Sequence, residues 1–261
     1  MKATTFQRMM NLPALVTAAN WRAARKCVAT CNHPISMLYS YVALPSFDAP
    51  IAFEWKTPIG WIKLQAWNPF DVVTQFITFC REQYMAEENI DLVVDFGSNI
   101  GISAAYFLSR NAHVRVHMFE PNRDLHKRME ENLACFRGRF EISDMCITGD
   151  GRTVTFGSDS SGVFSGIDKF PQRATSRPSL SASTALARII EDKGDISILK
   201  IDIEGAETEV LESLSPHVLA RIRRVYAENS PLDASYREVH LDGFRAEHVG
   251  GIWCYDRLRT V

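Results

Sequence analysis

The chain has 261 residues, of which 46% are hydrophobic, and its 29 basic and 31 acidic side chains give a formal net charge of −2. This length can bury one large core, with or without a small appendage. A nearly neutral chain has no basic field to hold a phosphate backbone, so we expect no nucleic-acid partner. No apolar run reaches the ~18 residues of a membrane span, so we expect no membrane partner either.

Residues 1–85 are expected to form an N-terminal extension. Residues 17–30 have a helical pattern with a basic centre, which favours a solvated surface helix over a substrate lid or a dimer arm. Residues 51–56 and 61–66 alternate like strands around a Pro-Gly turn and predict a β-hairpin. Asp71 is expected to cap a helix over 72–84.

Residues 86–261 are expected to form the main domain, in which strands and helices alternate. Such alternation predicts a doubly wound α/β fold, with a mostly parallel sheet covered by helices on both faces. The expected strands are 92–96, 114–119, 139–146, 196–202 and 222–228, and the expected helices are 100–110, 123–135, 183–192 and 205–214. Residues 246–249 and 252–255 flank two glycines and predict an antiparallel hairpin at the sheet edge.

A separate region between residues 149 and 178 is rich in Gly, Ser and Asp. Within it, residues 151–156 are expected to form a short extra strand. Residues 157–166 are expected to form a loop of small residues, either a plain solvent loop or one that closes over a ligand.

The most informative motif is a glycine-rich turn between the first expected core strand and the following helix. It reads D-x-G-x-x-x-G from Asp95 to Gly101, which differs from the G-x-G-x-x-G that cradles a dinucleotide pyrophosphate. Glu120 ends the next strand, 19 residues after Gly101, about where such folds place an acid that binds ribose hydroxyls. An acid at the turn and no phosphate cradle suit S-adenosylmethionine, an adenosyl ligand with a positive charge.

A third motif, L-K-I-D-I-E-G-A-E over residues 199–207, ends another apolar strand in an acidic turn. Together with V-V-D-F-G-S-N-I-G and M-F-E-P-N, it resembles the FkbM family of S-adenosylmethionine-dependent methyltransferases over roughly residues 50–230. The resemblance implies a Rossmann-like class I methyltransferase fold with a seven-stranded sheet, and methylation of a hydroxyl group. The chain departs from the family pattern at residues 183–187, where an acidic stretch is usual.

Four acidic residues end expected strands, namely Asp95, Glu120, Asp202 and Glu228. Because ligands of open α/β sheets bind at the carboxyl ends of the strands, these carboxylates should converge on one crevice. Their mutual repulsion would be relieved by a cationic ligand. The residues expected to bind the methyl donor are Asp95, Gly97, Ser98, Asn99, Gly101, Glu120, Pro121 and, at the adenine edge, Cys146.

Asp202 is expected to act as the base that removes the acceptor's proton, or to orient the acceptor. Lys200, two residues earlier on the same face of the strand, either holds Asp202 ionised or neutralises it structurally. Glu204 is a further catalytic candidate. For Glu204 and Glu207 the alternative is capping of the following helix, whose dipole favours carboxylates in its first turn.

A less favoured hypothesis places Mg²⁺ on Asp202, Glu228 and Asn229, because oxygen ligands of similar type hold magnesium in catechol-type O-methyltransferases. The leading function is O-methylation of a small polar acceptor, such as a sugar or a secondary metabolite. The rivals are a magnesium-dependent catechol-type enzyme, a nicotinamide-dependent oxidoreductase and a non-catalytic adenosyl-binding protein. The scattered cysteines suggest a reduced, cytoplasmic protein, and a homodimer is a further expectation.

Overall fold

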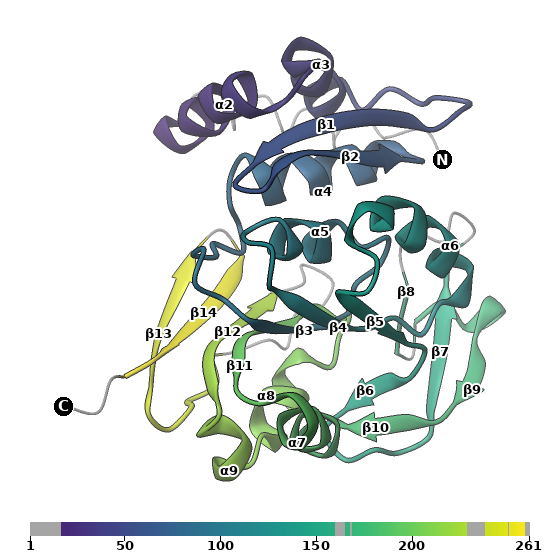
Figure 1. The fold of residues 1–261 in the computed structure, drawn as a ribbon. Coiled ribbons are helices and arrows are strands. Elements are labelled where there is room, and N and C mark those ends of the chain that lie inside the picture. Colours follow the sequence, from purple (N-terminus) through teal and green to yellow (C-terminus); the bar gives the residue numbers. More distant parts are fainter. Residues whose placement is uncertain (1–16, 160–164, 168, 229–237, 250, 259–261) are drawn as a thin grey trace.

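The computed structural model describes residues 17–159, 165–167, 169–228, 238–249 and 251–258 (Figure 1). The strands of the main sheet are β3 (Leu92–Phe96), β4 (Arg115–Phe119), β5 (Phe140–Ser143), β11 (Ile196–Ile201), β12 (Ile222–Glu228), β13 (Phe244–Val249) and β14 (Ile252–Arg257). Among the described residues they form one seven-stranded sheet in the order β13-β14-β12-β11-β3-β4-β5. The five strands β12, β11, β3, β4 and β5 pair in parallel. Strands β13 and β14 form an antiparallel hairpin at the edge, and β14 pairs with β12 in the antiparallel direction.

Helices cover both faces of this sheet (Figure 1). Helices α5 (Ile102–Leu108) and α6 (Arg123–Asn132) lie on one face, and α7 (Ala182–Lys193), α8 (Glu207–Ser213) and α9 (Pro216–Leu219) lie on the other. Successive strand residues alternate between the two cores, so Val93 is buried on the first face and Val94 on the second. The predicted doubly wound, mostly parallel architecture is confirmed.

The strand predicted over 139–146 is wrong in its second half. Strand β4 ends at Phe119, and the amide of Glu120 donates to the carbonyl of Ser143, so β5 has no ladder partner beyond that residue. The chain then leaves the main sheet, and β6 (Cys146–Thr148) pairs in parallel with β10 (Ser179–Ser181) in a separate small sheet. Cys146 therefore does not end the third core strand.

A three-stranded antiparallel sheet follows, made of β7 (Val154–Ser158), β8 (Ser165–Ile167) and β9 (Thr175–Arg177). The extra strand predicted over 151–156 exists, but it begins at Val154 and extends to Ser158. The described end of the predicted 157–166 loop belongs to β8, while residues 160–164 lie outside the described part. The structure also has two short 3-10 helices. The first, η1 (Ala134–Phe136), follows α6, and the second, η2 (Pro171–Arg173), lies between β8 and β9.

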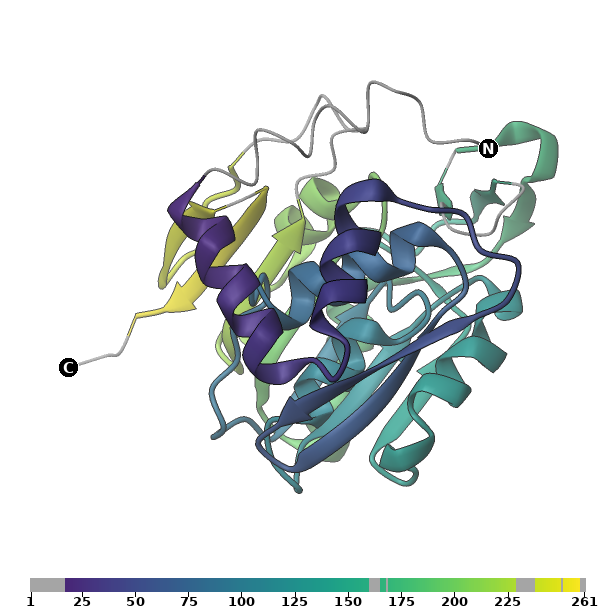
Figure 2. The ribbon, with the colours of Figure 1, turned by 90° about the horizontal axis from the view of Figure 1, so that it is seen from above.

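The N-terminal elements stack on the α5 face of the sheet (Figures 1 and 2). They are α2 (Ala18–Thr30), α3 (Pro34–Ala43), β1 (Ile51–Thr57), β2 (Gly60–Ala66) and α4 (Pro69–Phe79). The predicted hairpin is confirmed, with Trp55 opposite Ile62. Trp55 stacks on Phe79 at 5.0 Å between ring centroids, and Phe79 meets Tyr106 of α5 edge-on at 5.4 Å. The N-terminal elements and the sheet thus share one hydrophobic core, and the boundary at residue 85 stays a prediction.

Helix α4 begins three residues before its predicted start, because Asn68 and not Asp71 is its cap. The Asn68 side-chain oxygen accepts from the amides of Phe70 and Asp71 at 2.8 and 3.1 Å. The Asp71 carboxylate in turn accepts from the amide of Asn68 at 3.2 Å, which completes a capping box around Pro69. The helix ends at Phe79 and not at residue 84.

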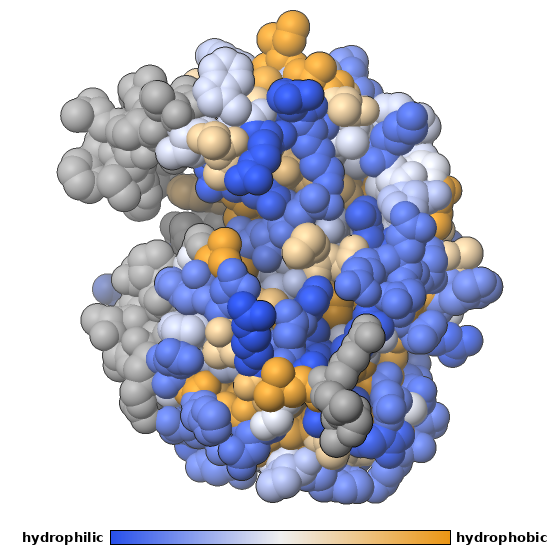
Figure 3. Space-filling view, turned by 90° about the vertical axis from the view of Figure 1, so that its left-hand side faces the viewer, coloured by the Kyte–Doolittle hydropathy of each residue, from blue (hydrophilic) through white to orange (hydrophobic). Residues whose placement is uncertain are grey.

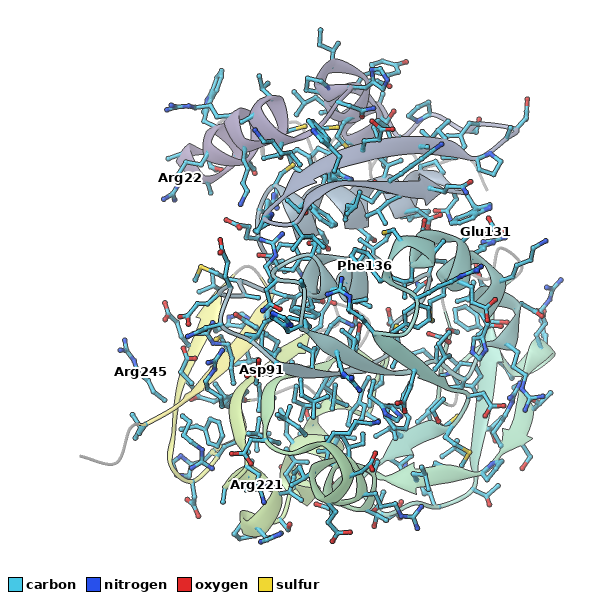
Figure 4. The ribbon with its side chains drawn as sticks, viewed as in Figure 1. Arg22, Asp91, Glu131, Phe136, Arg221 and Arg245 are labelled. Atoms are coloured by element: carbon cyan, nitrogen blue, oxygen red, sulfur yellow. The ribbon has the colours of Figure 1, made fainter. Side chains whose placement is uncertain are left out.

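The surface of the N-terminal helices is partly basic and partly hydrophobic. Ala23 and Cys27 of α2 are buried, while Arg22 points away from the body of the molecule (Figure 4), so the basic face is solvated as predicted. Hydrophobic side chains gather at the top of the view in Figure 3. Among the exposed hydrophobic residues of these helices, Ile35 of α3 is 84% exposed. No helix in the described part of the chain is long and apolar enough to cross a membrane.

Candidate active site

The candidate site lies at the carboxyl ends of the parallel strands, opposite Asp91 and Arg221, which mark the amino ends of β3 and β12 (Figure 4). Among the described residues, two cavities open there and share Gly97, Asn99, Asp202 and Glu204 in their walls. We call the first the Glu120 cavity; it has about 600 Å³ and is also lined by Phe119, Glu120, Pro121, Met145, Cys146 and Ile147. We call the second the α4 cavity; it has about 870 Å³ and includes α4, Tyr84, Lys200 and Glu228 in its walls.

Gly97 allows the backbones at the carboxyl ends of β3 and β11 to approach each other closely. Its φ is +81°, and a Cβ at this position would lie 1.7 Å from the carbonyl oxygen of Asp202. The amide of Gly97 also donates to the carbonyl of Phe119 at 2.9 Å. Backbone packing therefore requires glycine at this position of the turn. Gly101, with φ +81°, begins α5, and a Cβ there would lie 2.9 Å from Met129.

Glu120 is buried in the wall of its cavity and holds the glycine-rich turn in place. One carboxylate oxygen accepts from the amide of Asn99 at 2.9 Å, and the other accepts from the amide of Asn122 at 2.8 Å. Burial raises the pKa of Glu120 to about 7, although these two backbone hydrogen bonds lower it. Each carboxylate oxygen keeps a second lone pair with which it can accept from a ligand hydroxyl.

Asp95 lies beneath both cavities and lines neither of them. Its side chain is fully buried, and it accepts from the Ser103 hydroxyl at 2.6 Å and from Lys200 Nζ at 3.1 Å. Ser98 donates to the main-chain carbonyl of Asp95 at 3.0 Å. Lys200 and Ser103 do line the α4 cavity, so Asp95 acts on that cavity through them.

Lys200 joins the two strand ends that carry Asp95 and Asp202. Its ammonium lies 3.1 Å from Asp95 Oδ1, 3.2 Å from Asp202 Oδ2 and 3.0 Å from the carbonyl oxygen of Gly97. Burial lowers the pKa of Lys200, but the charges of Asp202 and Asp95 outweigh it and raise the pKa above its usual range. Lys200 therefore stays charged and places positive charge beside Asp202.

Glu228 forms an acid pair with Asp202. The negative charge of Asp202 and burial raise the pKa of Glu228 well above its usual range, and a hydrogen bond between the two carboxyl groups contributes. Tyr84 donates to Glu228 Oε2 at 3.0 Å. At neutral pH, Glu228 therefore carries a proton, and Asp202 lies beside both Glu228 and Lys200.

Two further acids in the K-I-D-I-E-G-A-E motif differ in their surroundings. Glu207 is fully buried and accepts from the amides of Ile203 and Gly205 at 3.0 and 2.9 Å, so it fixes the turn before α8. Glu204 lies in the walls of both cavities and forms an ion pair with Lys169 at 3.2 Å. Of the two, only Glu204 faces the candidate site.

The structure thus brings most of the predicted site residues together and adds others. Pro121 and Cys146 line the Glu120 cavity even though Cys146 belongs to the separate β6 strand. The α4 cavity adds Tyr84 and residues of α4, which no strand-end motif signals. Asn229 of the magnesium hypothesis lies outside the described residues. Within the described part of the chain, no group of three or more His, Cys, Asp or Glu side chains is arranged to hold a metal ion.

A parallel sheet with a glycine-rich turn, an acid after the second strand and a cavity over both is the arrangement of a Rossmann-like ligand-binding enzyme. Residues 95–248, more than half of the chain, match the methyltransferase FkbM domain. The chain therefore belongs to the FkbM methyltransferase family, whose members use S-adenosylmethionine as the methyl donor.

Comparisons with individual proteins give more distant similarities. The AMB antimetabolite synthetase AmbE of Pseudomonas aeruginosa is 28% identical in an alignment of 174 positions, and the match covers 52% of this chain and 8% of that relative's length. A methyltransferase from Geobacter sulfurreducens is 16% identical, with a TM-score of 0.38 over 72% of this chain and 77% of that one. The C-terminal domain of precorrin-6Y C5,15-methyltransferase from Rhodobacter capsulatus is 15% identical, with a TM-score of 0.35 over 72% and 89%.

Proposed function

We propose that this protein is an S-adenosylmethionine-dependent O-methyltransferase that acts on a hydroxyl group of a small polar molecule. The observation that carries the proposal is the pair of cavities that meet at Gly97 and Asn99, with Glu120 in the wall of one and Asp202 in the wall that both share. The secondary-metabolite class of acceptor is supported by the name of the AmbE relative, an antimetabolite synthetase. Because this chain spans 8% of that relative, the acceptor itself is left to experiment.

The residues of the Glu120 cavity fit the adenosine part of the donor. Glu120 offers carboxylate oxygens to the ribose hydroxyls, and Phe119, Pro121 and Met145 offer apolar surface beside the base. Asp202 and Glu204 place two carboxylates in the wall that the cavities share, which suits a cationic ligand. When bound, the donor supplies a methyl carbon already activated by the sulfonium.

The chain's own task is then to position the acceptor and to remove its proton. Asp202 is suited to accept that proton, because it is 27% exposed in the shared wall of the cavities and lies 3.2 Å from the Lys200 ammonium. Glu228, which accepts from Tyr84, also contacts the Asp202 carboxylate and helps to orient it.

Binding of S-adenosylmethionine and of S-adenosylhomocysteine tests the proposal directly. We expect micromolar-range affinity in isothermal titration calorimetry and a higher melting temperature with ligand. Glu120→Ala should weaken both by about 1–3 kcal/mol, the cost of hydrogen bonds to a charged group. Glu130→Ala, a change on the exposed face of α6, is the matched control and should leave affinity unchanged. Absence of binding to the wild-type protein would contradict the proposal.

The affinity for S-adenosylhomocysteine, the demethylated product of the donor, should also depend on pH through Glu120. Because only the ionised carboxylate accepts from both ribose hydroxyls and its pKa is about 7, affinity should be constant above pH 8 and fall as the pH drops through 7. The same raised pKa favours the protonated native state, so Glu120's contribution to the free energy of unfolding should decrease as the pH rises from about 4.5 to 7. Calorimetric titrations at pH 6, 7 and 8 measure the pH dependence of the affinity, and Glu120→Gln should remove that dependence.

A further inference from the structure

Helices α2 and α3 carry large hydrophobic side chains on the surface of the molecule. Nine large hydrophobic residues are exposed in the described part of the chain, and four of them lie on these two helices: Trp21, Val28, Ile35 and Tyr39. These four are between 62% and 84% exposed. Hydrophobic residues scattered singly over a surface are ordinary, but a group of them beside charged residues is typical of a surface that binds a partner.

The four residues point away from the body of the molecule. Trp21 and Val28 lie about two turns apart on one side of α2, and Ile35 and Tyr39 lie about one turn apart on α3. The buried sides of both helices pack into one core cluster with residues of β1 and α4. The two helices thus form a single layer on the far side of the N-terminal elements from the main sheet (Figures 1 and 2). Figure 3 shows hydrophobic side chains at the same end of the molecule.

This end of the chain also carries an excess of positive charge. Residues 1–47 contain five Lys and Arg side chains and no Asp or Glu, so their formal charge is +5. Residues 48–261 contain 24 basic and 31 acidic side chains, which give −7. Lys26 of α2 forms an ion pair with Glu82, but the exposed Arg22 and Arg25 form none with any residue that the structure describes. We call the whole set the outer face: Trp21, Arg22, Arg25, Val28, Ile35 and Tyr39.

These features favour an anionic lipid surface over a second copy of the chain. A symmetric dimer built on the outer face would bring the arginines of both copies into one interface, where like charges repel. Aromatic and aliphatic side chains beside arginines, with no acid among them, are typical of helices that lie in the headgroup region of a negatively charged membrane. The lack of a spanning segment does not bear on this contact, because such a helix does not cross the bilayer.

We propose that the outer face of α2 and α3 binds the surface of an anionic membrane. Its hydrophobic side chains enter the boundary between headgroups and acyl chains, and Arg22 and Arg25 contact the lipid phosphates. None of the residues of the outer face lines the Glu120 cavity or the α4 cavity. The proposal therefore goes beyond methyl transfer, and its test does not depend on it.

Sedimentation of the full-length protein with lipid vesicles tests the proposal. The wild type should bind vesicles made of equal amounts of phosphatidylcholine and phosphatidylserine, and it should bind vesicles of phosphatidylcholine alone far less. Raising the salt concentration from about 0.1 M to about 1 M should weaken binding, because salt screens the arginines. Arg22→Gln combined with Arg25→Gln should weaken binding about 30-fold, as expected for two arginines near an anionic surface. Ile35→Ser should weaken it about 10-fold through the lost hydrophobic contact.

Two matched controls carry equivalent changes elsewhere on the surface. Arg115→Gln combined with Arg245→Gln removes the same charge from exposed positions of β4 and β13. Leu258→Ser removes an exposed hydrophobic side chain after β14. Both controls should bind the anionic vesicles as the wild type does. All of the variants should keep the wild-type melting temperature, because every changed side chain is exposed.

Tryptophan fluorescence supplies a second readout. Anionic vesicles should shift the emission of the wild type to shorter wavelength, and Trp21→Phe should lose most of this shift while it keeps most of the binding. If the wild type does not bind the anionic vesicles, the proposal is overturned, whether the outer face then proves to bind an acidic protein or a second copy of the chain. Equal binding of the wild type and the Arg22→Gln, Arg25→Gln variant also overturns it, since residues outside the outer face would then hold the protein on the vesicle.

Discussion

Asp202→Asn is expected to lower methyl transfer by about 10²–10⁴, the usual contribution of a general base. The substitution keeps the shape of the side chain and its place in the shared wall of the cavities, but it removes the basic oxygen. The Asp202 carboxylate is 27% exposed in that wall, where an acceptor hydroxyl can reach it. Transfer of a labelled methyl group from S-adenosylmethionine to a panel of small hydroxyl compounds measures the effect.

Three controls distinguish proton transfer by Asp202 from a role in donor binding or metal binding. S-adenosylhomocysteine affinity should change little in Asp202→Asn, because Glu120 supplies the contacts to the ribose in the proposed function. Glu204→Gln, a change in the same cavity walls, should reduce turnover far less, because the ion pair with Lys169 already engages that carboxylate. If Asp202 instead holds Mg²⁺, EDTA should abolish wild-type turnover and added Mg²⁺ restore it. Near-normal turnover of Asp202→Asn without chelator sensitivity would remove Asp202 from the mechanism.

The sequence predicted the parts of the site that depend on local pattern. An apolar strand, a turn with glycine at Gly97 and Gly101, and a helix form a unit whose geometry is set within a few residues. The acids at strand ends follow from the same rule, because parallel strands present their carboxyl ends at one edge. For that reason Glu120, Asp202 and Glu228 lie around joined cavities as expected.

What the sequence did not predict depends on contacts between distant segments. Asp95 was expected to bind the donor, and packing of β3 against β11 buries it under Lys200, outside the walls of both cavities. Tyr84 and residues of α4 line the site because the N-terminal elements stack on α5, and no periodicity signals that docking. Cys146 lines the Glu120 cavity from β6, which pairs with β10 in a separate sheet, and not from the end of the third core strand.

Lys200→Met should destabilise the protein by about 3–5 kcal/mol, the usual cost of removing one partner of a buried ion pair. Lys200 is 2% exposed, and its loss leaves the fully buried Asp95 without a cation. Asp95 would retain only the hydrogen bond from the Ser103 hydroxyl to its side chain. Urea or guanidinium unfolding followed by circular dichroism measures the change in the free energy of unfolding.

A double-mutant cycle separates the buried charge from the lost packing. Adding Asp95→Asn to Lys200→Met removes the stranded carboxylate, so the double variant should be more stable than Lys200→Met alone. Lys193→Met is the matched surface control, because Lys193 pairs with the half-exposed Glu141 at 2.7 Å and such a pair contributes about 0–1 kcal/mol. If Lys200→Met costs no more than Lys193→Met, the ion pair does not hold the two strand ends together. The glycine-rich turn would then depend on the backbone contacts of Gly97 and on Glu120, which accepts from the Asn99 amide.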